Sequence, residues 1–226
     1  MALSLNRQDL YDRAAQATEH WKNAFDPESG LLTGESEYYE GNRWNYSFRP
    51  FHDPQERMAL CGGQKAYLAL LDRFFGYTDA QDRSGRFEGF NNETDMEAPW
   101  AYHPAGRYDR IVEILEAGDR YAFRDKNGGT GRGGIPGNND SGGLSSCYIW
   151  NTLGIFPVSG KDEMMICKPK FCHAELRLAS GNVLSIQRIG SGTVPVRAEF
   201  NGKEADAMCI GAAECMSGGK LKIYME

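Results

Sequence analysis

The sequence lacks the features that define several large classes of protein. It has no run approaching the about 18 apolar residues of a membrane span, and its first residues carry neither the basic nor the apolar stretch of a secretory signal. Its basic residues are scattered along a chain of net charge -6, so no basic cluster favours nucleic acid. We therefore expect no membrane span and no nucleic-acid partner, and a neutral ligand such as a sugar fits better. The compartment is left open.

Motifs for thiol, serine and phosphate chemistry are also missing. The six cysteines form no CxxC pair and no zinc-ligand spacing, which favours buried free thiols, with disulfides as the alternative. The four histidines come with no GxSxG and no Cys/His pairing. A glycine-rich stretch is present at 128–134, but GxxxxGK[ST] is absent, so nucleotide binding is disfavoured.

Apolar residues at three- and four-residue steps predict amphipathic helices in the first two thirds of the chain. The predicted helices cover residues 7–25, 62–75, 107–122 and about 144–153. They are too few and too widely spaced to close an independent bundle. The helical part is therefore expected to belong to something larger.

The pattern changes from residue 156 onward to short alternating or β-branched runs, broken by Ser-Gly, Asn-Gly and Gly-Gly turns. The predicted strands cover residues 163–166, 174–178, 183–188, 194–200 and 221–224. The chain is therefore predicted to be α+β, with a helical part over 1–155 and a C-terminal antiparallel β unit over 156–226.

The first of three polar loops, residues 37–54, places carboxylates among aromatic rings. Such a mixture suits a sugar, because its apolar face stacks on rings while its hydroxyl groups need hydrogen-bond partners. The alternative is that the rings only anchor the loop to the core.

The second loop, residues 89–103, gathers Asn92, Glu93 and Asp95. Clustered amide and carboxylate oxygens are the ligands that calcium prefers, and no sulfur or paired histidine suggests zinc. A solvated acidic turn is the alternative.

The third loop, residues 128–143, is rich in glycine, which lets a backbone approach a ligand closely. Asp140 stands just before a predicted helix, at the positive end of its dipole. An ordinary helix cap is the alternative role for this residue.

Taken in order, these segments resemble glycoside hydrolase family 92, the calcium-dependent exo-acting α-mannosidases. The segments that carry the resemblance are FDPESG at 25–30, EGNRWNYS at 40–47, PFHD at 50–53, NETD at 92–95, GNNDSG at 137–142 and GGKLKIY at 218–224. Together they extend over nearly the whole chain. The resemblance implies the last part of a fold in which a β-sandwich precedes an (α/α)6 barrel that ends in β structure, so the helical part would be a partial (α/α)6-barrel-type region.

The resemblance also implies an inverting hydrolysis, in which one carboxylic acid protonates the leaving oxygen and a carboxylate activates water from the opposite face. By position, Glu40 matches the general acid and Asp140 matches the general base. Asn138 falls beside the base and is a supporting candidate.

Further site residues follow from the same resemblance. Asn92 and Glu93 match the segment associated with Ca²⁺, and the backbone carbonyl of Arg43 is a further expected ligand. The segment NNET at 91–94 departs from the usual GNEP of the family, and Met96 and Glu97 replace the histidines that often follow. The residues expected to bind substrate are Trp44, Tyr46, His52 and Asp53.

The leading hypothesis is a mannosidase-like hydrolase whose partner is a carbohydrate, an α-mannoside of the N-glycan type. The alternative is a divergent chain that binds carbohydrate without independent activity and needs an N-terminal partner. A partial barrel would also expose apolar surface, which predicts an oligomer or a partner domain.

Overall fold

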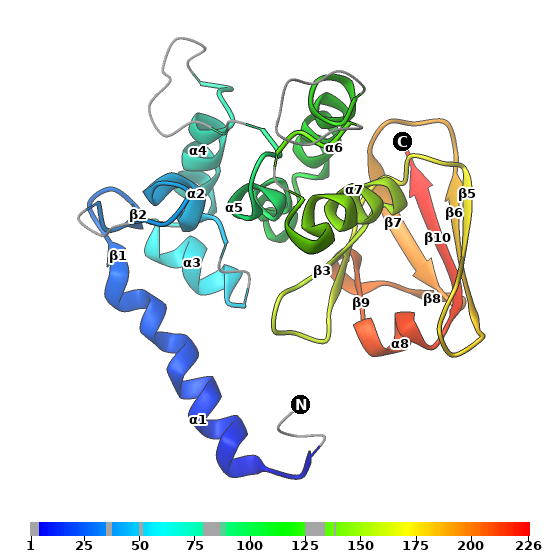
Figure 1. The fold of residues 1–226 in the computed structure, drawn as a ribbon, viewed down its shortest axis with the longest axis horizontal. Coiled ribbons are helices and arrows are strands. Elements are labelled where there is room, and N and C mark those ends of the chain that lie inside the picture. The colour runs from blue at the N-terminus through cyan, green and yellow to red at the C-terminus, as the bar shows by residue number, and fades with distance from the viewer. Residues whose placement is uncertain are drawn as a thin grey trace.

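A computed structural model describes residues 5–34, 38–49, 52–78, 87, 89–124, 134–137 and 139–226. Helices make up the first part of the chain and sheets most of the rest (Figure 1). The α-helices are α1 (Gln8–Thr18), α2 (Arg43–Ser47), α3 (Pro54–Leu60), α4 (Gln64–Phe74), α5 (Glu93–Met96), α6 (Tyr108–Ala117), α7 (Gly143–Leu153) and α8 (Ala212–Met216). The 3-10 and π turns are η2 (Glu19–Ala24), η3 (Ala98–Ala105), η4 (Gly118–Ala122), η5 (Asp140–Gly142) and η6 (Asp206–Met208).

The strands form three sheets. They are β1 (Phe25–Asp26), β2 (Leu31–Leu32), β3 (Ile155–Pro157), β4 (Met164–Ile166), β5 (His173–Arg177), β6 (Val183–Ile189), β7 (Pro195–Phe200), β8 (Lys203–Glu204), β9 (Cys209–Ile210) and β10 (Gly219–Met225). The sheet orders are β1-β2, β3-β4-β9 and β5-β6-β10-β7-β8. The predicted α+β class with a C-terminal β unit is confirmed.

One pairing differs from the prediction of an antiparallel unit. Strands β6 and β10 run parallel, with Ile186 opposite Leu221, while the other pairings of the five-stranded sheet are antiparallel. A parallel pair needs a long connection, and β7, β8, β9 and α8 lie between these two strands in the chain.

The predicted helices are present, but two of them change character before they end. The helix predicted over 107–122 becomes a π turn at Gly118, where an added Cβ would lie 2.5 Å from the Phe90 ring. The close approach of that ring explains the need for glycine. The helix predicted over 7–25 is α-helical only to Thr18 and then continues as the 3-10 turn η2.

Helix α1 extends away from the rest of the described chain (Figure 1). None of its residues is buried by the residues that the structure describes, and Leu10 and Tyr11 are 38% and 45% exposed. Within the described residues, nothing therefore buries the predicted apolar stripe of α1. Its continuation does pack, since the Trp21 ring meets Phe25 edge-on at 6.2 Å. Within the described ranges, no helix has the length and hydropathy to cross a membrane.

The small sheet β3-β4-β9 lies between two hydrophobic cores. Phe156 and Met165 belong to the core formed with the helices, which we call the helical core. Ile155, Met164 and Ile166 belong to the core formed with the five-stranded sheet, which we call the sheet core. Both faces of these strands are buried, which explains why the run at 164–167 is continuously apolar rather than alternating. The predicted boundary between residues 155 and 156 stays a prediction.

All six cysteines lie in the described ranges, and none of them is in a disulfide. Burial raises the pKa of the Cys147 and Cys167 thiols to about 12. In contrast to the predicted burial, Cys172 is exposed, and Cys61 and Cys209 are only half-buried. Free thiols therefore stay the prediction for these cysteines.

We expect His103 to make the fold sensitive to acid. Its side chain is buried, with Nε2 at 3.2 Å from the carbonyl oxygens of Ile166 and Met208, and burial lowers its pKa to about 4. The unfolded chain takes up a proton near pH 6.5 but the folded chain does not, so stability falls as the pH drops from 6.5 towards 4. We expect a loss of roughly 3 kcal/mol at the lower end, because one pKa unit is about 1.36 kcal/mol.

Urea unfolding of the His103→Gln variant between pH 7 and pH 4 measures this effect. The variant should show a flatter dependence of the unfolding free energy on pH than the parent chain. His173→Gln is the matched control, since the side chain of His173 is 50% exposed. Equal slopes in all three proteins would contradict the assignment to His103.

Candidate functional site

The first predicted loop contains helix α2, which begins with a reciprocal cap. The Asn42 side chain accepts a hydrogen bond from the Trp44 amide at 2.8 Å, and the Asn45 side chain accepts one from the Asn42 amide at 3.2 Å. Such a capping box gives partners to two backbone N–H groups that the start of a helix otherwise leaves unpaired. The predicted acid, Glu40, lies two residues before this cap.

Glu40 has a backbone φ of 52°, in the left-handed region that disfavours residues with a Cβ. The Asn92 side chain contacts it twice, with Nδ2 at 3.1 Å from the Glu40 carbonyl oxygen and 3.3 Å from Oε2. One amide group therefore contacts both the backbone and the carboxylate of Glu40. Strained backbone conformations of this kind concentrate at functional sites.

Asn92 also starts helix α5, because its Oδ1 accepts a hydrogen bond from the Glu93 amide at 2.8 Å. The first turn of α5 carries the buried carboxylate of Asp95. Its Oδ1 lies 2.6 Å from Nδ2 of Asn45, which is also buried. The first and second loops are thus joined by an exposed contact and a buried one.

The third loop presents a second strained carboxylate. Asp140 and Ser141 have φ values of 36° and 58°, and Asp140 is exposed. The capping oxygen for α7 comes from Asn139, whose Oδ1 accepts hydrogen bonds from the Ser145 amide at 2.9 Å and from its hydroxyl at 3.0 Å. The capping alternative for Asp140 therefore loses its support. Asn138, the supporting candidate, lies outside the described residues.

The third loop packs directly against the second. A Cβ added at Gly137 would lie 2.1 Å from the Asn91 carbonyl oxygen, so only glycine fits there. At Gly143, an added Cβ would lie 3.1 Å from Cε of Met96. Backbone segments far apart in the sequence thus meet around Asn91 and Asn92, and the predicted acid and base lie on loops that touch the same segment.

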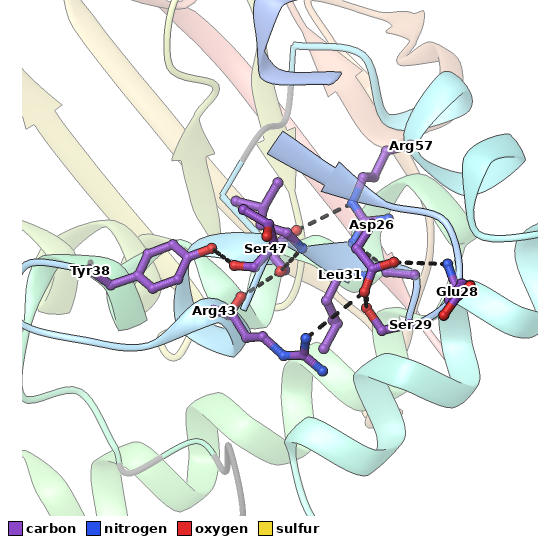
Figure 2. Close-up of polar contacts among 11 residues, drawn as sticks. Asp26, Glu28, Ser29, Leu31, Tyr38, Arg43, Ser47 and Arg57 are labelled. Atoms are coloured by element: carbon purple, nitrogen blue, oxygen red, sulfur yellow. Dashed lines mark hydrogen bonds and ion pairs between the residues drawn. The ribbon is translucent and has the colours of Figure 1, made fainter. Parts of the chain in front are cut away.

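Arg43 is held by contacts on two sides (Figure 2). Its carbonyl oxygen, the predicted metal ligand, accepts a hydrogen bond from the Ser47 hydroxyl. Its guanidinium lies 4.0 Å from the Asp26 carboxylate. Ser47 in turn accepts a hydrogen bond from the Leu32 amide at 2.8 Å, which fixes α2 to the β1-β2 hairpin.

The two aromatic residues predicted to bind substrate have different surroundings. Trp44 is 7% exposed and stacks on Phe74 in the helical core, which matches the alternative that rings anchor this loop. Tyr46 lies closer to the surface, with its ring 5.1 Å from the Tyr38 ring and its hydroxyl 2.5 Å from the Tyr39 carbonyl oxygen. Tyr46 is therefore better placed for a ligand than Trp44.

His52 and Asp53 lie at the start of α3. The Asp53 carboxylate accepts a hydrogen bond from the Glu56 amide at 3.0 Å, and Pro54 occupies the first helical position, as expected for an N-cap. The His52 ring meets Trp21 edge-on at 6.2 Å, and its buried Nε2 has no hydrogen-bond partner among the described residues. The contacts seen for Asp53 are therefore those of a helix cap.

The predicted calcium ligands are oxygen atoms of three different kinds. Within the described ranges, no group of three His, Cys, Asp or Glu side chains is arranged to hold a metal ion. Asn92 and Glu93 are adjacent, and a carbonyl oxygen that accepts one hydrogen bond keeps a second lone pair for a cation. The set of one carboxylate, one amide oxygen and the Arg43 carbonyl has the hard donors that calcium prefers, with a single formal charge.

Comparison with known proteins gives the family that the sequence resembles, over all 226 residues of this chain. Residues 1–226 match the model of the glycosyl hydrolase family 92 catalytic domain. An uncharacterized secreted glycosidase of Arthroderma benhamiae is 27% identical over 201 residues, which cover 86% of this chain and 24% of that protein.

The fold is similar to those of two solved structures from Bacteroides thetaiotaomicron. A family GH92 α-mannosidase aligns with a TM-score of 0.82 and 18% identity, over 100% of this chain and 32% of that one. A family GH92 inverting mannosidase aligns with a TM-score of 0.77 and 22% identity, over 100% of this chain and 35% of that one. The chain therefore spans about a third or less of the length of these relatives.

Proposed function

Because the chain belongs to glycosyl hydrolase family 92, we propose that it carries the acid and the base of an α-mannosidase that hydrolyses α-mannosides. The observation that carries this proposal is the meeting of the three polar loops around Asn91 and Asn92. Asn92 contacts the Glu40 carboxylate, and the loop of Asp140 packs against Asn91. The similar proteins whose structures are known include α-mannosidases of this family, which supports the substrate class.

In the proposed reaction, Glu40 protonates the leaving oxygen of the mannoside while Asp140 takes a proton from the attacking water. Asn92 would orient the Glu40 carboxyl group and stabilise the negative charge that remains after proton transfer. Asp140 is suited to bind water because it is exposed and because Asn139 supplies the capping oxygen. One similar protein is an inverting mannosidase, which supports single displacement.

We also propose that Asn92, Glu93 and the Arg43 carbonyl hold Ca²⁺. When bound, the ion supplies positive charge that orients sugar hydroxyl groups. The helical part would form a section of an (α/α)6 barrel whose remainder is not in this chain. One observation favours a second function, carbohydrate binding without turnover. The chain spans only about a third of the length of the solved structures to which it is similar.

Release of mannose tests the proposal. The chain is incubated with an α-linked mannobiose and with a β-linked control in calcium, in EDTA, and in EDTA followed by calcium or magnesium. We expect release from the α-linked substrate only, lost in EDTA and restored by calcium.

Isothermal titration with mannose, run on the same samples, separates the two functions. Calcium-dependent binding without release would favour the binding function. If mannose is neither bound nor released in calcium, both are wrong for this chain. Mannose release that continues in EDTA would contradict the proposed calcium site but not the proposed hydrolysis.

A further inference from the structure

A buried hydrogen bond joins the two loops that meet at Glu40. Asn45 in α2 and Asp95 in α5 are 6% and 2% exposed, and their side chains lie 2.6 Å apart across 50 residues of sequence. Burial of a carboxylate is costly unless it is hydrogen-bonded, so a pair of this kind tends to define a single arrangement of its surroundings. The two helices are five and four residues long, too short to be stable without tertiary contacts.

The Asn45–Asp95 pair completes a ring of contacts that begins and ends at Glu40. The Asn45 Oδ1 accepts from the Asn42 amide, two residues after Glu40. Asp95 lies in the helix that Asn92 caps, and the start of that helix is fixed further because the Asp95 amide donates to the Asn92 carbonyl at 3.0 Å. Asn92 then donates to the Glu40 backbone and carboxylate. Apart from the buried pair, the contacts of this ring are local in sequence or exposed to solvent.

Glu40 needs such support because its backbone is in a disfavoured conformation, with φ at 52°. The exposed contact with Asn92 competes with water and cannot define the position of the carboxyl group alone. The other end of α2 is held separately. The Leu32 amide donates a hydrogen bond to the Ser47 hydroxyl oxygen, and Nε of Arg57 donates one to the Ser47 carbonyl oxygen at 3.3 Å (Figure 2). Loss of the buried pair should therefore move the Glu40 end of α2 more than its far end.

We infer that Asn45 and Asp95 are positioning residues, which hold the Glu40 carboxyl group where it can protonate a leaving oxygen. This inference rests on the proposed function. The pair acts through Glu40 and Asn92, and it touches no reacting atom. It also explains why two short helices from separate loops carry buried polar side chains that face each other.

An exchange of the two side chains gives a sharp test. Asn45→Asp replaces the donor by a second carboxylate, which breaks the hydrogen bond. The double variant Asn45→Asp with Asp95→Asn restores a donor opposite an acceptor, and it keeps an oxygen for the Asn42 amide. Trp100→Phe is the matched control, because it removes a partly buried hydrogen bond to Asn151, 2.9 Å long, between η3 and α7 and not between α2 and α5.

The readout is the ratio of kcat for two α-mannosides, one with an alkyl leaving group and one with a dinitrophenyl leaving group that needs no protonation. In Asn45→Asp, we expect kcat to fall by about 10²-fold for the alkyl mannoside, as for a reacting group displaced by about 1 Å, and to change little for the dinitrophenyl mannoside. The double variant should recover most of the loss. Trp100→Phe should lower the melting temperature without changing the ratio.

A second measurement keeps the inference separate from the proposed function. Nuclear magnetic resonance of the Glu40 amide and the Asn92 side-chain amide should show both signals shifted in Asn45→Asp and restored in the double variant, with or without turnover. A parent chain that cleaves neither mannoside would overturn the proposed function. Unchanged signals, or equal loss of kcat for both mannosides, would overturn the positioning role.

Discussion

Replacing Asp140 by Asn is expected to lower kcat for α-mannosides by about 10²–10⁴-fold, the usual contribution of a positioned general base. An amide cannot accept the proton of the attacking water, so the effect should be the same for good and poor leaving groups. The melting temperature should change little, because Asp140 is exposed and the capping hydrogen bonds to Ser145 come from Asn139. Steady-state kinetics and thermal unfolding measure the two effects.

Asp162→Asn is the matched control for this change. Asp162 accepts a hydrogen bond from the Ala213 amide at 2.7 Å at the start of α8, in the C-terminal part of the chain. Its replacement should leave kcat unchanged. If Asp140→Asn loses no more activity than Asp162→Asn, the base is a different residue.

Replacing Glu40 by Gln is expected to have an effect that depends on the leaving group. For an alkyl mannoside, kcat should fall by about 10²–10⁴-fold, because the departing oxygen is no longer protonated. For a dinitrophenyl mannoside the loss should be small. Gln keeps a carbonyl oxygen for the Asn92 amide, so the loop contact remains.

Glu93→Gln serves as the comparison, because it alters the carboxylate that we assign to calcium rather than to the leaving group. Its loss should depend on calcium concentration and not on the leaving group. Equal losses for both mannosides in Glu40→Gln would contradict a role as the general acid and would indicate a structural role instead.

The elements that the sequence predicts well are the long ones. Helices α4, α6 and α7 each contain at least ten residues, enough for the three- and four-residue spacing of apolar side chains to be visible. Helices α2, α3 and α5 contain four to seven residues, too few for such a pattern, so no helix is predicted at these positions. Their caps are nevertheless present in the sequence, since Asn42, Asp53 with Pro54, and Asn92 are typical start signals.

The sequence predicts which three loops carry the candidate site, but it does not predict how these loops contact one another. The roles assigned to Glu40 and Asp140 come from the family resemblance, and they stay predictions. The contact of Asn45 with Asp95 spans 50 residues and cannot be derived from local patterns. Trp44 shows a second limit, because an aromatic residue in a polar loop suits a sugar and a core equally well until its burial is known.

The small sheet β3-β4-β9 couples the stability of the helical core to that of the sheet core. Met164 and Met165 are neighbours in the chain, yet one side chain fills the sheet core and the other the helical core. If the helical part or the C-terminal sheet unfolded alone, the apolar side chains of the other part would be exposed to water. We therefore expect the described chain to unfold as one cooperative unit rather than as two. Damage to the packing of the C-terminal sheet can thereby reach the three polar loops without touching any residue in them.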